Sequence, residues 1–179
     1  MHIYLDAEGA FEERKACEII YQILKAIEFL HSKNVLHLDI KPENVLLMSP
    51  FTSIKSTETN NNEQETEIKV KLCDFSFSQI MKPGKTILGM MGTAAYSAPE
   101  ILQYEELTKA TDMWSLGVLA HVILTEYTPF GNGTEENNQT QTNILSVREK
   151  EFECVEDYFD TISAPAKNFI ESLLKYRPK

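Results

Sequence analysis

The sequence predicts a mainly α-helical fold, a helical bundle with one small β-hairpin. Apolar residues recur at helical spacing between residues 12 and 31, and a nearly all-apolar stretch runs from 112 to 126. Two short runs of strand-forming residues on either side of a polar tract indicate the hairpin. The chain has 179 residues, 42% of them hydrophobic, so it can bury one sizeable core, which we place around the 112–126 helix.

The first predicted helix spans residues 12–31. Its apolar residues follow the i, i+3, i+4, i+7 rhythm of one buried helix face, and the polar residues 32–34 end it. These apolar residues are Ile20, Ile23, Leu24, Ile27 and Leu30. The run at 35–36 that follows predicts a short buried strand.

The hairpin is predicted from residues 45–47 and 68–73. The first run is apolar, and the second alternates between apolar and polar side chains, as a half-buried strand does. Between them, Ser, Thr, Asn, Gln and Glu dominate, and such a stretch buries too little apolar surface to fix its backbone. We therefore expect a disordered insert at about 48–67, at the tip of the hairpin.

Residues 74–100 have no clear periodicity and contain Gly, Pro, Ser and Thr, which is typical of a long functional loop. Thr111 or Asp112 can cap the helix that runs to about residue 126. That helix is apolar nearly all round, so we expect it to be central and buried. Ser163, with a proline two positions later, predicts the start of a last helix.

The net charge limits the classes of partner. Lys and Arg number 17 against 27 Asp and Glu, a formal charge of −10, which disfavours binding to nucleic acid or to an anionic membrane. The longest apolar stretch, 116–124, is too short to cross a bilayer, and no signal peptide is visible. The three cysteines are widely spaced and lack a C-x-x-C arrangement, which favours inert thiols in a reduced compartment. We therefore expect an intracellular protein.

A dense polar island, residues 37–44, separates two of the predicted strands. For a single Asp or Asn, a capped turn would be the simpler explanation. Here a carboxylate (Asp39), an ammonium group two residues later (Lys41) and an amide five residues later (Asn44) together suit an anion, a metal ion and a hydroxyl proton. Asp74 delivers a second carboxylate at the end of the 68–73 strand, which suggests handling of a divalent metal and phosphate.

These motifs resemble those of a known family. The chain is similar to the C-terminal lobe of eukaryotic Ser/Thr protein kinases, whose signatures include H-R-D-x-x-x-x-N, D-F-G and A-P-E. The details resemble the death-associated and calcium/calmodulin-dependent kinase group. The matching residues are His37-Leu38-Asp39 with Asn44, Asp74-Phe75-Ser76, Gly92-Thr93, Tyr96, Ala98-Pro99-Glu100, and Asp112-Met113-Trp114-Ser115 with Gly117.

The resemblance implies a role for each matching residue. Asp39 and Lys41 would be catalytic: Asp39 orients or accepts the proton of the substrate hydroxyl, and Lys41 neutralises charge on the transferring phosphoryl group. Asn44 and Asp74 would hold magnesium. The residues expected to contact the cofactor are Lys41, Glu43, Asn44 and Asp74. Thr93, Glu100 and Asp112 would have structural roles or shape the substrate-binding segment, and His37 would be a packing residue.

The resemblance also implies a reaction and its participants. The cofactors would be ATP and Mg²⁺, and the γ-phosphate would pass to Ser and Thr hydroxyls of protein substrates. The setting would be intracellular signalling or apoptosis-related regulation, in the cytoplasm, the nucleus or both. Control by calmodulin, through a segment outside this chain, stays open. The protein substrate cannot be named from the sequence.

The chain departs from the family pattern in two residues and in its extent. Leu38 replaces the Arg that pairs with a phosphorylated activation loop in many kinases, so we expect activity that does not depend on that phosphate. Ser76 replaces a Gly, which would strain the backbone if that position needs a positive φ.

The resemblance covers a partial domain, with the N-terminal lobe, the last helix and an Arg partner for Glu100 expected to be missing. Alone, the chain is therefore expected to be almost inactive. The alternative is a pseudokinase or a fragment that acts as a protein-binding module.

Overall fold

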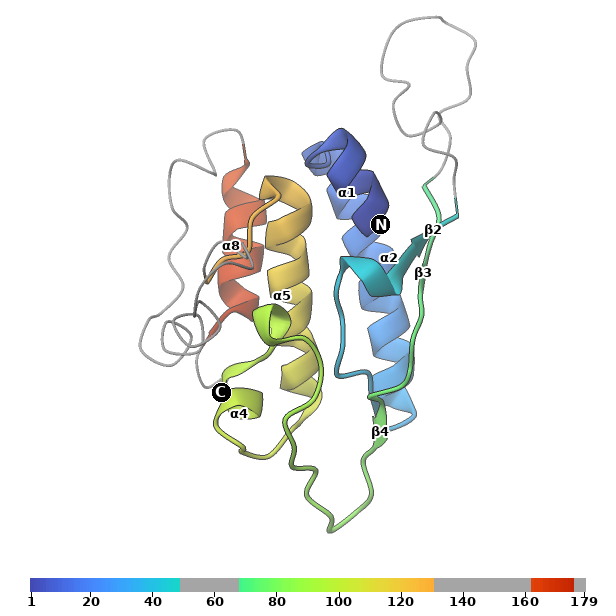
Figure 1. The fold of residues 1–179 in the computed structure, drawn as a ribbon, viewed down its shortest axis with the longest axis vertical. Coiled ribbons are helices and arrows are strands. Elements are labelled where there is room, and N and C mark those ends of the chain that lie inside the picture. The colour runs from blue at the N-terminus through green and yellow to red at the C-terminus, as the bar shows by residue number, and fades with distance from the viewer. Residues whose placement is uncertain (49–67, 131–161, 176–179) are drawn as a thin grey trace, which may run out of the picture.

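Three long helices dominate the computed structural model, which describes residues 1–48, 68–130 and 162–175 (Figure 1). They are α2 (Glu13–Ser32), α5 (Lys109–Thr125) and α8 (Ala164–Leu173). The other helices are α1 (His2–Glu8), α4 (Pro99–Leu102) and the 3₁₀ turns η1 (Pro42–Asn44) and η2 (Ala94–Tyr96). The strands are β1 (Val35–Leu36), β2 (Val45–Leu47), β3 (Val70–Leu72) and β4 (Gln79–Ile80). The described part is thus helix-rich with few strands, as the sequence predicts.

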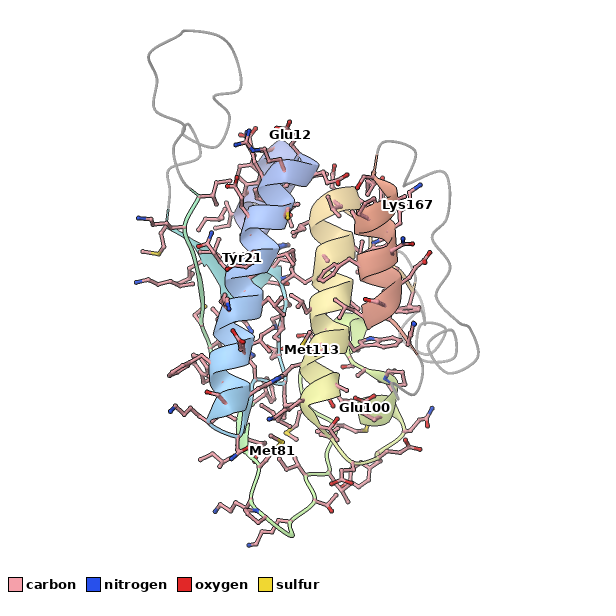
Figure 2. The ribbon with its side chains drawn as sticks, turned by 180° about the vertical axis from the view of Figure 1, so that it is seen from behind. Glu12, Tyr21, Met81, Glu100, Met113 and Lys167 are labelled. Atoms are coloured by element: carbon pink, nitrogen blue, oxygen red, sulfur yellow. The ribbon has the colours of Figure 1, made fainter. Side chains whose placement is uncertain are left out.

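Helix α5 lies between α2 and α8 and packs against both (Figure 2). Most of its residues are buried, which confirms the prediction of a central helix. The core side chains between the three helices include Ile19, Ile23 and Ile27 of α2, Leu116, Leu119 and Ile123 of α5, and Ile170 of α8. Fully burying a side chain of this kind stabilises the fold by about 1.5–3 kcal/mol.

Gly117 sets how closely α5 and α8 approach. A Cβ atom at this position would lie 2.8 Å from Cβ of Leu173 and 2.9 Å from Cδ2 of Leu174, closer than real side-chain carbons pack. The close spacing of α5 and α8 therefore requires glycine, which has no side chain, at position 117.

The start of α5 corrects the sequence prediction. The N-cap is Thr108, neither Thr111 nor Asp112. The Thr108 hydroxyl accepts a hydrogen bond from the Ala110 amide at 3.2 Å, and the Thr111 hydroxyl accepts one from the Thr108 amide at 3.0 Å. Thr111 is thus the reciprocal partner in a capping box, inside the helix. By contrast, α2 begins and ends within one residue of its predicted bounds, and Ser163 caps α8 as predicted.

Two antiparallel strand pairs frame the polar island. β2 pairs with β3, with Val45 opposite Leu72, which confirms the predicted hairpin. β1 pairs with β4, with Val35 opposite Ile80. The sequence did not predict this second pair, because β4 lies in the segment that was expected to be a loop and has only two residues. Residues 49–67, which make up nearly all of the predicted insert, lie outside the described residues.

In the described ranges, no helix is both long and apolar enough to cross a membrane.

Candidate functional site

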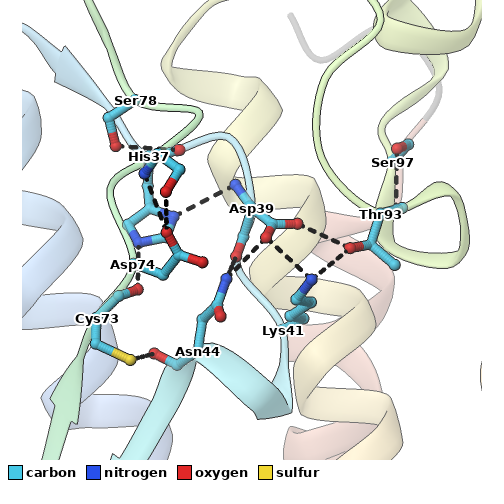
Figure 3. A network of polar contacts seen from close by, with 10 residues as sticks. His37, Asp39, Lys41, Asn44, Cys73, Asp74, Ser78, Thr93 and Ser97 are labelled. Atoms are coloured by element: carbon cyan, nitrogen blue, oxygen red, sulfur yellow. Dashed lines mark hydrogen bonds and ion pairs between the residues drawn. The ribbon is translucent and has the colours of Figure 1, made fainter.

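Asp39 is the centre of a hydrogen-bonded polar cluster (Figure 3). Its carboxylate is almost fully buried, at 2% exposure. Oδ1 accepts a hydrogen bond from the Thr93 hydroxyl at 2.9 Å. Oδ2 accepts one from Nδ2 of Asn44 at 2.8 Å and lies 3.0 Å from Nζ of Lys41. The cluster therefore holds a buried carboxylate whose charge is balanced by one ammonium group.

Thr93 joins this cluster to a distant part of the chain. Its hydroxyl accepts a hydrogen bond from Nζ of Lys41 at 2.7 Å while donating to Asp39. The Ser97 hydroxyl donates to the Thr93 carbonyl at 3.1 Å, and the Ser115 hydroxyl, on α5, donates to the Tyr96 carbonyl at 2.9 Å. The segment around η2 is thereby tied both to the polar island and to the central helix.

Asp112 anchors the polar island to the helices beneath it. The side chain is fully buried, and its two oxygens accept hydrogen bonds from the amides of Leu38 (2.8 Å) and His37 (3.0 Å). His31, at the end of α2, contacts Oδ2 of the same carboxylate through Nε2 at 2.8 Å. No local sequence pattern links His31 to a residue 81 positions away, so only the structure reveals this contact.

Gly92 allows the segment that carries Thr93 to approach the polar island. Its φ is +84°, and a Cβ atom there would lie only 2.4 Å from the carbonyl oxygen of Leu38. Only glycine fits both the left-handed backbone and this close contact. The Gly92-Thr93 pair therefore works as a unit, in which the glycine lets the threonine reach Asp39.

His37 is buried within the cluster and packs against Phe75, with ring centroids 5.0 Å apart. Nδ1 accepts a hydrogen bond from the Asp39 amide at 3.3 Å, which leaves Nε2 to donate to the Cys73 carbonyl at 3.2 Å. Burial lowers the pKa of His37 below its ordinary value, against the opposing effect of the Asp112 charge. A neutral imidazole held at both nitrogens is a packing residue rather than a base.

Asp74 lies beside the cluster because of the β2–β3 register. The Cys73 amide donates to the Asn44 carbonyl at 2.9 Å, so Cys73 lies opposite Asn44. Asp74 is the next residue and therefore comes close to Asn44. Oδ1 of Asp74 accepts hydrogen bonds from the Ser76 hydroxyl (2.6 Å) and the Ser76 amide (3.1 Å). These two bonds lower the pKa of Asp74, and the nearby charge of Lys41 adds to the effect.

The expected strain at Ser76 does not occur. Positive φ angles are found at Asp74 (+61°) and Leu38 (+66°), but not at Ser76. The left-handed residue of this turn is the aspartate, a residue type that tolerates this conformation better than most. Ser76 instead supplies the hydrogen bonds that hold the turn.

The oxygen atoms near Asp39 suit a hard cation. Within the described ranges, Oδ1 of Asn44 and Oδ2 of Asp74 receive no hydrogen bond, while Nδ2 of Asn44 and Oδ1 of Asp74 are engaged. The same ranges contain no group of three or more His, Cys, Asp or Glu residues that could hold a metal by themselves. Magnesium typically takes one or two protein oxygens and completes its shell with phosphates and water, so this donor set fits it.

Two of the predicted site residues stand apart from the cluster. Glu43 is exposed on η1 and makes no hydrogen bond or ion pair with another described residue. Glu100 accepts a hydrogen bond from the Thr111 hydroxyl at 2.7 Å and forms no ion pair within the described ranges. The structure therefore brings Asp39, Lys41, Asn44 and Thr93 into direct contact, with Asp74 and Asp112 adjoining them.

Leu38 belongs to a separate apolar cluster. It is 2% exposed and packs with Leu36, Ile101 and Leu107. Met81, Ile87 and Met91 of the 74–100 segment pack against the same group. Apolar contacts thus connect this segment to the polar island at the position where many kinases have an arginine.

Comparison with known proteins matched residues 1–179 to the family described as "Protein kinase domain". The chain is 37% identical over 175 residues to serine/threonine-protein kinase 17A of Oryctolagus cuniculus, covering 97% of this chain and 39% of that protein. It is 35% identical over 174 residues to "Death-associated protein kinase related" of Drosophila melanogaster, covering 97% and 23%. It is 36% identical over 167 residues to death-associated protein kinase dapk-1 of Caenorhabditis elegans, covering 93% and 10%. The chain thus spans well under half the length of each of these relatives.

Proposed function

Because this chain belongs to the protein kinase domain family, we propose that it carries the catalytic loop of a serine/threonine protein kinase. The reaction is transfer of the γ-phosphate of ATP to Ser and Thr hydroxyls of protein substrates. ATP with Mg²⁺ supplies the phosphoryl group, and phosphoryl transfer depends mainly on positioning and on charge stabilisation. The residues of the polar cluster provide both.

Asp39 is the proposed catalytic carboxylate. A substrate hydroxyl placed against it is oriented for attack, and Asp39 accepts its proton as the new bond forms. The hydrogen bonds from Thr93 and Asn44 hold the carboxylate in one orientation. This ordered carboxylate, held from both sides, is the single observation that carries the proposal.

Lys41 is proposed to neutralise charge on the phosphoryl group, since its ammonium lies 3.0 Å from Asp39 and so close to the acceptor position. Asn44 and Asp74 would hold magnesium through their free oxygen atoms. Asp112 and Thr93 would hold the polar island, residues 37–44, in position. Glu43 has the weakest support as a cofactor contact, because it lies outside the cluster.

The names of the relatives support the enzyme over the protein-binding alternative. All three are named as kinases, and two are named as death-associated. We propose accordingly that the protein acts in signalling related to cell death. The identity of the protein substrate and any control by calmodulin are properties of the whole protein, and we do not assign them from this chain.

The test is transfer of radiolabelled phosphate from ATP by the intact protein to peptides that differ only in a Ser, Thr or Tyr acceptor. We expect labelling of the Ser and Thr peptides and its loss in Asp39→Asn, which keeps the size of the side chain but removes the base. Asp6→Asn, at an exposed site on α1, is the matched control and should leave labelling unchanged. Equal labelling by Asp39→Asn and the wild type would refute the role of Asp39.

A further inference from the structure

We propose that Ser76 is a positioning residue whose hydroxyl holds Asp74 in the orientation that presents its free oxygen, Oδ2, for Mg²⁺·ATP. This inference rests on the proposed function and deepens it by assigning a role to a residue that departs from the family pattern. The resemblance implies glycine at this position, and glycine cannot make the side-chain bond.

The hydrogen bonds at Asp74 are asymmetric. Both bonds from Ser76 end on Oδ1, with the hydroxyl at 2.6 Å and the amide at 3.1 Å. Oδ2 accepts no hydrogen bond from another described residue. A short hydroxyl-to-carboxylate bond is among the stronger hydrogen bonds in proteins, so it determines which oxygen stays free.

The backbone of Asp74 is in an unfavourable conformation, which the hydrogen bond from the Ser76 hydroxyl helps to maintain. Asp74 has a φ of +61°, a conformation that non-glycine residues adopt at a cost. The residue before it is fixed, because the amide and the thiol of Cys73 both donate to the Asn44 carbonyl, at 2.9 and 3.3 Å. Relaxation of the turn would therefore rotate Asp74 itself, and the Ser76 hydroxyl resists that rotation.

The location of Ser76 favours a role at the site over a role in the core. Ser76 and Asp74 are both exposed, so their bond satisfies no buried polar group. Outer-shell partners of metal-binding side chains orient those side chains, and their removal weakens metal binding by roughly 10- to 100-fold. We expect an effect near the lower limit, about tenfold. The backbone amide of residue 76 can still donate its hydrogen bond to Asp74 when the side chain is Ala, Gly or Thr.

The experiment compares Ser76→Ala, Ser76→Gly and Ser76→Thr with the wild type in the intact protein. The primary readout is the calorimetric affinity for Mg²⁺ together with a non-hydrolysable ATP analogue, which needs no turnover. Thermal unfolding verifies that each variant is folded. Ser32→Ala, which removes an exposed hydroxyl bonded to the Phe29 carbonyl on α2, is the control and should bind like the wild type.

Weaker binding by the Ala and Gly variants, with recovery in Ser76→Thr, supports the positioning role. Unchanged affinity in both Ser76→Ala and Ser76→Gly overturns it and leaves the proposed function intact. Conversely, a wild type that binds the magnesium–nucleotide complex but transfers no phosphate overturns the proposed function. In that case the binding comparison still decides the role of Ser76.

Discussion

Asp112 is the residue whose removal should damage the site most without touching the reacting atoms. Replacing it with Ala leaves two buried amides, those of His37 and Leu38, without an acceptor, and removes the partner of His31. Each buried donor left unsatisfied costs about 1–3 kcal/mol. Because two such amides lose their acceptor, we expect Asp112→Ala to lower the free energy of unfolding by about 2–6 kcal/mol.

Denaturant unfolding followed by circular dichroism measures this loss. Asp112→Asn is the matched variant, because its amide keeps one acceptor oxygen but turns an NH₂ group toward a donor. We expect it to lose about 1–3 kcal/mol. Asp6→Ala, at an exposed site, should change stability by less than about 0.5 kcal/mol. A loss below about 1 kcal/mol for Asp112→Ala would refute the view that this carboxylate anchors the polar island.

Three further predictions concern the same region. Gly92→Ala should lower the free energy of unfolding by at least about 1–2 kcal/mol, the cost of a left-handed backbone alone, and should reduce phosphate transfer, because its Cβ would meet the Leu38 carbonyl. Urea unfolding and the peptide assay measure both effects, and wild-type values in both would contradict the close contact. Thr86→Ala should leave phosphate transfer within about twofold of wild type. Leu38 stands where many kinases have an arginine, and leucine has no guanidinium group to bind a phosphate on Thr86. Strong activation by phosphorylation at Thr86 would refute this. Burial lowers the pKa of both His37 and His121, so the unfolded chain binds protons more readily and stability should fall as the pH drops below about 6.5. Unfolding measured from pH 8 to pH 5 checks this. If the loss of stability at low pH is smaller in His121→Gln than in the wild type, the difference is the contribution of His121.

The local sequence pattern was sufficient for the elements that carry their own signal. The 3.6-residue period located α2, the continuous apolar run located α5, and alternation located β3 opposite β2. It was insufficient for the pairing of β1 with β4 and for the short helices. A two-residue strand or a four-residue helix has too few residues to show a period, and neighbouring elements stabilise it.

The chemical groups of the candidate site were determined by the sequence itself. Asp39, Lys41 and Asn44 lie within six residues, so any fold of this segment keeps them close together. Only the tertiary structure decided what holds them: the Thr93 hydroxyl, the Asp112 carboxylate and the contact of Asp112 with His31. Those contacts join residues that are 54 to 81 positions apart, and they exist only once α2 and α5 have packed and buried the groups that must pair.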